Sequence, residues 1–203
     1  MKLAKLVVSA GTMLCVTAFA ATLAAAPQVG QPAPDFTVKD TNGTSHSLQD
    51  FAGKNVVLEW TNHDCPFVVK HYSGNMQQLQ QDMQAKDVVW LSVISSAPGK
   101  QGHIDSAKSA ELTSSRNASP TAVLFDESGT MGKAYDAKTT PHMYVIDKAG
   151  VLQYMGGIDS IPSAKVDDIA KATPYFANAA NAVLAGNAPD PAVTRPYGCS
   201  VKY

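Results

Sequence analysis

The stretch EWTNHDCPFVVKHY, residues 59–72, carries most of what the sequence says about fold and chemistry. It continues an apolar run and places Cys65 and Pro66 where that run gives way to helical spacing. The position three residues after the cysteine, which would complete a Cys-x-x-Cys pair, is Val68. A redox cycle at Cys65 therefore cannot close within this motif, and the sulfur that would complete it has to come from elsewhere.

Apolar runs on both sides of this stretch predict a sheet. Continuous runs rich in β-branched residues are typical of buried central strands, and two segments separated by a short turn predict a hairpin. The expected buried strands are residues 55–61, 87–95 and 121–125, the expected late hairpin is 142–147 with 151–157, and an early hairpin turns at Asn42-Gly43.

Helical spacing predicts the intervening elements. Apolar residues from Val69 to Met83 recur every three or four positions, with Asp64 as the expected N-cap and Gly74 as a point of kink or break. Further helices are expected over 105–115, near 131–135, and from Thr173-Pro174 to residue 184. This order predicts a mixed sheet covered on both faces.

The first residues have the three parts of a secretory signal peptide. Lys2 and Lys5 precede an apolar run over 6–26 that contains small-residue cleavage sites. We expect residues 1–26 to be a signal peptide, 27–186 a single domain, and 187–203 a Pro-rich tail carrying Cys199. The alternative is an uncleaved membrane anchor. With cleavage, we expect secretion into a bacterial periplasm without stable membrane insertion.

Composition limits the partners. The chain has 203 residues and a net charge of −1, so there is no electrostatic case for nucleic acid or an anionic membrane. Two cysteines remain after processing, Cys65 and Cys199, which are too few for a disulfide framework.

Cys65 stands where a strand is expected to end and a helix to begin. Unpaired N–H groups of the first helical turn favour thiolate over thiol, and the carboxyl end of a strand should leave the sulfur exposed. His63 would support this effect if protonated, and Asp64 would oppose it. The alternative is a small buried residue that only fills space.

The strand, Cys-Pro and helix at LEWTNHDCPFVVKHY (58–72), followed by TTPHMYVIDKAGVLQYMGG (139–157), resemble the thioredoxin-like redoxins of the AhpC/TSA (peroxiredoxin-related) and TlpA-like branch. The resemblance covers about Gly30 to Gly157. RPYGCSVKY (195–203) resembles the C-terminus of a secreted or periplasmic subgroup with one cysteine in a Cys-Pro-aromatic-Val motif. It implies an α/β thioredoxin-like fold: a central mixed sheet flanked by helices on both faces, with an N-terminal β-hairpin extension and an extended C-terminal tail.

The resemblance also assigns roles to residues. It makes Cys65 the nucleophile, Pro141 a cis proline facing it, and Thr140 a source of backbone groups for a bound thiol or disulfide. Glu59 lies six positions before the cysteine, as does the buried acid that accepts a proton in thioredoxins. An ordinary strand-start proline and a solvated strand-end glutamate remain the alternatives.

Other residues near the motif are expected to line the substrate cleft: Trp60, Asn62, His63, Pro66 and His142. Trp60 is equally compatible with the core. The peroxiredoxin pattern has threonine where this chain has Asn62, and neither Arg116 nor Arg195 falls where a peroxide-orienting arginine is expected. Peroxide reduction and disulfide exchange both stay open, and no cofactor or metal is expected.

Cys199 is the expected partner of Cys65, on a tail mobile enough to reach it. Cys65 would attack a peroxide or a disulfide, Cys199 would resolve the product, and an external thiol reductant would reopen the pair. Alternatives are a permanent staple stabilising by roughly 4–5 kcal/mol, or pairing with another chain. A non-enzymatic copper- or thiol-binding module is the other function class, although copper chaperones of the Sco type carry a Cys-x-x-x-Cys pair that is absent here.

Overall fold

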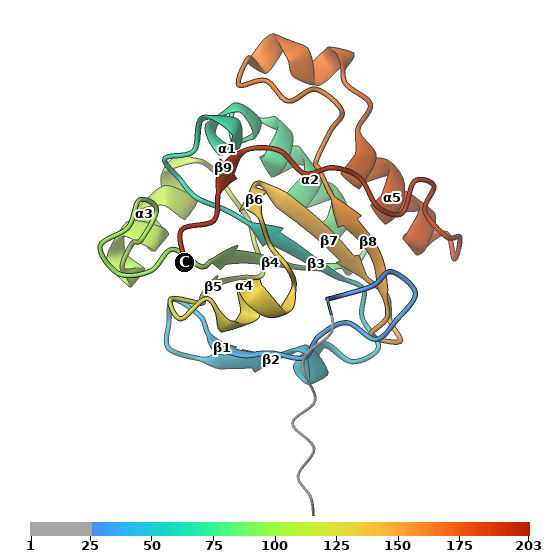
Figure 1. The fold of residues 1–203 in the computed structure, drawn as a ribbon, viewed down its shortest axis with the longest axis horizontal. Coiled ribbons are helices and arrows are strands. Elements are labelled where there is room, and N and C mark those ends of the chain that lie inside the picture. Colours follow the sequence, from blue (N-terminus) through green and yellow to red (C-terminus); the bar gives the residue numbers. More distant parts are fainter. Residues whose placement is uncertain (1–25) are drawn as a thin grey trace, which may run out of the picture.

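The computed structural model describes residues 26–203, so the expected signal peptide lies outside the described residues except for Ala26. Among the described residues, no helix is long and apolar enough to cross a membrane. A five-stranded mixed sheet, in the order β5-β4-β3-β7-β8, forms the centre of the molecule (Figure 1). This confirms the α/β thioredoxin-like class with a mixed sheet.

The central strand, β3 (Val56–Trp60), is buried along its whole length. It pairs in parallel with β4 (Val89–Ile94) on one side, and β4 pairs in parallel with β5 (Ala122–Phe125). On the other side β3 pairs antiparallel with β7 (His142–Ile146), which pairs antiparallel with β8 (Leu152–Gly156). A strand with neighbours on both edges and covered faces needs apolar residues throughout, which is why its sequence shows no alternation.

Alternate residues of these strands feed two separate cores. Leu58 and Trp60 face one side, where α4 (Thr130–Ala134) and the segment around Phe36 cover the sheet. Val57 and Trp90 face the other side, where α2 (Asn75–Gln84) and α5 (Tyr175–Leu184) pack. Helices therefore lie on both faces, as the apolar runs predict.

The helical region after Cys65 is two helices. Gly74 has φ 135°, a backbone conformation that favours glycine, and it separates α1 (Pro66–His71) from α2. The N-cap of α1 is Cys65 itself and not Asp64. The buried stripe is also shifted, since Val69 is half exposed while Val68, Lys70 and His71 are buried.

The N-terminal hairpin is present as β1 (Thr37–Lys39) and β2 (Ser45–Ser47), paired antiparallel and followed by a short 3₁₀ helix, η1 (Leu48–Phe51). Helix α3 (Ser106–Ser115) lies between β4 and β5 in the chain. A second 3₁₀ helix, η2 (Val166–Lys171), was not predicted, because its surroundings show no apolar periodicity.

The C-terminal tail is extended, but it is docked along its length. Residue Met155 of β8 bonds through its backbone to Ala192 and Thr194, and Val201 donates to the carbonyl of Lys138. Between them, β9 (Cys199–Ser200) pairs antiparallel with β6 (Thr139–Thr140). Figure 1 shows the tail in red, passing from α5 to α1 and β6. The expectation of a mobile tail is therefore wrong, because main-chain hydrogen bonds hold the tail in place.

His142 begins β7 as a buried residue of the sheet and not as a cleft residue. Its ring is tilted against that of Tyr144, with centroids 4.5 Å apart, and its Nδ1 lies 3.0 Å from the hydroxyl of that tyrosine, within hydrogen-bond distance. Burial lowers the pKa of His142 from 6.5 to about 3, with Asp136 opposing the shift. The folded protein therefore holds this imidazole neutral at every pH above that value.

This neutral histidine should make the protein acid-sensitive. Below pH 6.5 the unfolded chain binds a proton that the folded chain excludes, so the free energy of unfolding should fall as pH falls towards about 3. At pH 4 the free energy of unfolding should be lower than at neutral pH by about 3 kcal/mol because of His142 alone. Urea unfolding of wild type and His142→Phe at several pH values checks this: the variant's stability should vary less with pH, whatever its absolute stability. Parallel curves would contradict it.

Candidate active site around Cys65 and Cys199

Cys65 lies at the end of the loop that leaves β3 and caps α1, and its side chain is fully buried. The expected exposure of this sulfur is wrong, because the C-terminal tail covers it. The carbonyl oxygen of Thr140 lies 3.1 Å from the sulfur and accepts from the thiol. The backbone N–H of Cys199 donates to the same sulfur at 3.4 Å.

The two cysteines are therefore neighbours although they are 134 residues apart in the chain. Cys199 pairs with Thr140 in the β6–β9 ladder, which fixes its backbone beside Cys65. Both cysteines are free thiols here, and Cys199 is half-buried. The approach needs Gly198, because a Cβ there would lie 2.0 Å from the Thr140 carbonyl oxygen and its φ is 139°.

The two thiols differ in acidity. Burial raises the pKa of the Cys65 thiol, but hydrogen bonds from the Cys199 thiol, the Cys199 N–H and the Val68 N–H outweigh burial and leave that pKa lowered. Burial, together with the hydrogen bond and charge of Cys65, raises the pKa of Cys199 to about 11. Cys65 is thus the more acidic thiol of the pair, so it ionises before Cys199, whose thiol can then donate to it. A helix of six residues contributes little to this, so the local donors are the main cause.

Pro141 follows Thr140 through a cis peptide bond, and both residues are buried. Thr140 contacts the Cys65 sulfur through its carbonyl, while the hydroxyl of Thr140 lies 3.5 Å from the carbonyl oxygen of Cys199. The backbone before Pro141 therefore already holds an extended cysteine-containing strand.

The loop before Cys65 is fixed from two sides. The carbonyl of Asn62 accepts from the Cys65 N–H at 3.0 Å, and the side chain of Asn62 accepts from Asp64 and donates to the carbonyl of Gln101. Arg116 donates to the carbonyl of His63 at 2.9 Å. These contacts make Asn62 a buried loop anchor, whereas Pro66 is exposed in the first turn of α1. Burial lowers the pKa of His63, against the charge of Asp64.

Glu59 is fully buried in β3, so the solvated alternative is wrong. Its carboxyl group accepts from the indole of Trp90 at 2.9 Å, the hydroxyl of Tyr72 at 2.9 Å and the hydroxyl of Ser92 at 3.0 Å. Burial raises the pKa of Glu59, although these donors oppose the rise. Within residues 26–203 Glu59 has no hydrogen bond to either cysteine, so its part in proton transfer stays a prediction.

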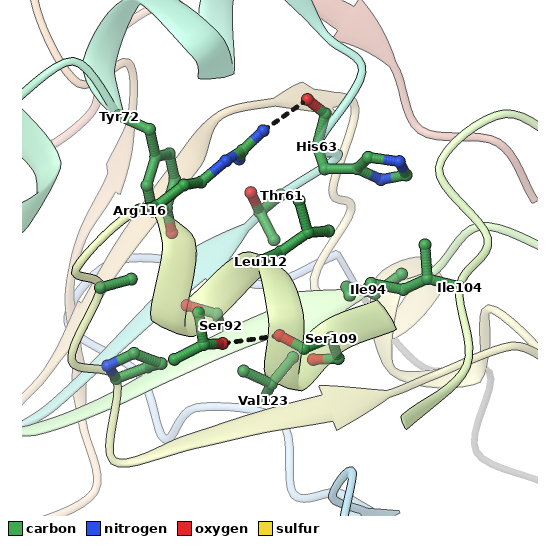
Figure 2. Close-up of a pocket in the computed structure, with 13 residues that line it drawn as sticks. Thr61, His63, Tyr72, Ser92, Ile94, Ile104, Ser109, Leu112, Arg116 and Val123 are labelled. Carbon is green, nitrogen blue, oxygen red and sulfur yellow. Dashed lines mark hydrogen bonds between the residues drawn. The ribbon is translucent and has the colours of Figure 1, made fainter. Parts of the chain in front are cut away.

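A pocket lies beside this carboxyl group, between α3 and the sheet (Figure 2). Its lining residues include the polar side chains of Thr61, Tyr72 and Ser92 and the apolar side chains of Leu112 and Ile104. Figure 2 shows Arg116 alongside Tyr72, reaching to the carbonyl of His63. Cys65 is not among the residues that line this pocket.

Trp60, expected in the cleft or the core, lies in the core. It is fully buried, packs against Tyr135 and Tyr144, and donates from its indole to Ser95 at 3.0 Å. With His142, it belongs to the buried interior of the sheet. Of the expected residues, the structure gathers Cys65, Cys199, Thr140 and Pro141 directly, with Asn62 and His63 in the adjoining loop.

Four residues near the site were not predicted: Lys70, His71, Asp159 and Tyr197. They form a buried polar cluster where α1 meets the tail. The only signal in the sequence was the pair Lys70-His71 within the helical stretch, which apolar spacing places on the solvent side. The cluster also needs Asp159 and Tyr197 from distant segments, which no local pattern indicates.

Comparison with known proteins identifies the family of this chain. The AhpC/TSA family model matches residues 29–155. This chain belongs to the AhpC/TSA family. The thioredoxin-like protein YneN of Bacillus subtilis is 30% identical over 128 residues, which are 62% of this chain and 69% of YneN.

Solved structures agree with this family's fold. A hypothetical protein from Sinorhizobium meliloti is 20% identical with a TM-score of 0.73, over 88% of this chain and 96% of that one. A putative thiol:disulfide interchange protein DsbE from Chlorobium tepidum is 24% identical with a TM-score of 0.51, over 64% of this chain and 85% of that one. The family model ends at residue 155, so the tail with Cys199 lies outside the matched segment.

Removing the Cys199 thiol should change the acidity of Cys65 in this family member. In Cys199→Ala the sulfur loses its thiol donor, so the pKa of Cys65 should rise. Since a hydrogen bond to a charged group is worth about 1.5–3 kcal/mol, the rise should be roughly one pH unit or more. The measurement is the pH dependence of Cys65 alkylation, followed on the peptide that contains it.

Cys199→Ser is the matched control, because its hydroxyl keeps a donor at the same position. Its midpoint should lie between those of wild type and Cys199→Ala. Identical midpoints in all three proteins would show that the side chain of Cys199 does not stabilise the thiolate.

Proposed function

We propose that the protein is a thiol–disulfide oxidoreductase in which Cys65 is the nucleophile and Cys199 the resolving cysteine. One observation carries the proposal: the backbone at Thr140 holds an extended strand whose cysteine contacts the Cys65 sulfur. A cysteine of a substrate polypeptide would have to be presented in the same way. The family membership and the lowered pKa of Cys65 support the proposal.

The proposed reaction has two exchanges. The Cys65 thiolate attacks one sulfur of an external disulfide, forms a mixed disulfide, and releases the other sulfur as a thiolate. Cys199 then attacks the Cys65 sulfur, forms the Cys65–Cys199 disulfide, and releases the second substrate sulfur, which takes up the proton that Cys199 lost. The substrate disulfide gains two electrons, the cysteine pair loses two, and an external dithiol reverses both steps to regenerate the enzyme.

The order of the two cysteines follows from their acidity. While Cys65 is a thiolate, its charge and hydrogen bond help to keep Cys199 protonated. Once the Cys65 sulfur is part of a mixed disulfide it carries no charge, so both contributions disappear and the pKa of Cys199 falls. Burial still raises the pKa of Cys199, but its thiol becomes more acidic, and so a better nucleophile, when there is a mixed disulfide to resolve.

Peroxide reduction has less support from the geometry. Within the described residues no arginine is hydrogen-bonded to Cys65, since Arg116 is engaged with the carbonyl of His63 and the ring of Tyr72. Residues 26–203 also contain no group of three His, Cys, Asp or Glu side chains placed to hold a metal.

For localisation, we propose that the protein acts after export, with residues 1–26 removed and residues 27–186 and 187–203 forming the domain and its tail. The basic start and apolar run support this part of the proposal. An oxidising compartment such as a bacterial periplasm would supply disulfides as substrates.

Trapping the intermediate tests the function. Reduced protein is mixed with one equivalent of oxidised glutathione, and the products are identified by intact mass and peptide mapping. Wild type should lose two thiols and gain a Cys65–Cys199 linkage, Cys199→Ser should stop as a glutathione adduct on Cys65, and Cys65→Ser should accumulate no adduct at Cys199 on the same timescale.

Two results would overturn the assignment. A Cys65–Cys199 linkage that resists mild reductant, together with an unreactive Cys65, would make the pair a structural staple. A parallel reaction with hydrogen peroxide that is much faster than the reaction with glutathione disulfide would make the protein a peroxidase.

A further inference from the structure

A cluster of buried ionisable side chains joins α1 to the C-terminal tail. Lys70 and His71, at the end of α1, are 1% and 0% exposed, and Asp159, in the segment after β8, is 5% exposed. Tyr197 of the tail completes the cluster. Charged side chains are rarely buried to this degree unless they are paired, so the cluster calls for an explanation.

The phenol oxygen of Tyr197 is the centre of the cluster. It donates its proton to Asp159 and lies 3.3 Å from the Lys70 Nζ and 3.2 Å from the His71 Nε2. The amide of Asn75 donates to the Nδ1 of His71 at 2.8 Å, which leaves the imidazole proton on Nε2, facing the phenol. Lys70 also donates directly to Asp159 at 3.2 Å. The hydroxyl of Tyr197 thus makes one bond as donor and two as acceptor.

The same tyrosine is fixed through its ring. The Tyr197 and Phe67 rings meet edge to face with centroids 5.7 Å apart, and the Lys70 ammonium lies 5.5 Å from the Tyr197 ring centroid. Tyr197 therefore contacts three residues of the short helix that begins at Cys65. The tail therefore contacts both ends of α1. Tyr197 contacts the C-terminal end of the helix, and Cys199 contacts Cys65 at its N-terminal end.

Net stability is a weak reason to build such a cluster. Replacing a buried ion pair by apolar groups is often neutral or stabilising, because desolvation offsets the attraction. Charged hydrogen bonds are, however, selective for position, since a displaced tail would leave Lys70 and Asp159 without their shared phenol. Only one residue, Gly198, separates Tyr197 from Cys199. Holding Tyr197 against α1 therefore also restricts how far Cys199 can move from Cys65.

We propose that Tyr197 is a positioning residue: with Lys70, His71 and Asp159 it latches the tail to α1, and this latch controls how often the tail lifts and admits an outside reagent to Cys65. The inference deepens the proposed function, because a buried Cys65 can meet an external disulfide only when the tail has moved. The latch itself is a property of the fold and can be tested without any turnover.

The test measures how fast the Cys65 sulfur is alkylated in the folded, reduced protein. Iodoacetamide is the probe, and the Cys65-containing peptide is quantified by mass spectrometry. Tyr197→Phe keeps the ring against Phe67 and removes only the hydroxyl, so alkylation should accelerate by about tenfold or more. Each rate is divided by that of the same variant in denaturant, and the pH dependence is recorded so that a changed pKa is separated from changed access.

Two further variants calibrate the result. Tyr203→Phe is the matched control: its hydroxyl also ties the tail down, by donating to the carbonyl of Ala137 at 2.7 Å, but it makes no contact with the cluster. It should change the rate by less than about twofold, as a surface contact does. Gly198→Ala forces the tail away from Thr140 and gives the rate for an uncovered sulfur.

Lys70→Met removes the ammonium group that α1 contributes to the latch, so it should also accelerate alkylation of Cys65. This variant provides the test should Tyr197→Phe fail to fold. Equal acceleration by Tyr197→Phe and Tyr203→Phe would overturn the latch, because the tail would then be held evenly along its length. An unchanged rate in both Tyr197→Phe and Lys70→Met, with a fast rate in Gly198→Ala, would overturn it as well. Failure of the glutathione trapping would reject the oxidoreductase while leaving this alkylation result intact.

Discussion

The pairing of β9 with β6 is the contact on which the site depends. It brings Cys199 beside Cys65, buries the nucleophilic sulfur, and supplies the N–H and thiol donors that lower its pKa. Without the tail, Cys65 would keep the Val68 donor but would lose both donors from Cys199. Acidity and protection of the sulfur therefore have the same structural origin, because the strand that covers the sulfur also brings these donors to it.

The sheet provides the rigid frame for this arrangement. Thr140 and Pro141 directly precede β7, and Cys65 follows β3, so the two sides of the site are carried by neighbouring, hydrogen-bonded strands. Glu59 lies in β3 under the same region, with its carboxyl group satisfied by three donors. A buried polar group that is fully hydrogen-bonded specifies a single packing, so Glu59 fixes Tyr72 and Trp90 whatever its part in chemistry.

The sequence was sufficient for the fold and insufficient for the environment of the sulfur. Strands β3, β4 and β5 were predicted because a strand covered on both faces is a continuous apolar run, and Gly74 correctly marked a break. Cys65 and Cys199 were paired by chemistry, but the burial of Cys65 was missed because it depends on a contact across 134 residues. Trp60 was left open between core and cleft for a related reason: local patterns do not show which segment covers a strand end.

The position of Cys199 also has a kinetic consequence. A thiol held against its target inside one chain reacts as if present at a very high local concentration, commonly millimolar or above even for flexible links, and far higher when the geometry is fixed. In the proposed cycle, resolution would be a first-order event that does not depend on protein concentration and that outcompetes free thiols. Covalent complexes with substrates would then be short-lived in the wild type, and the protein would release each partner before a second one arrives.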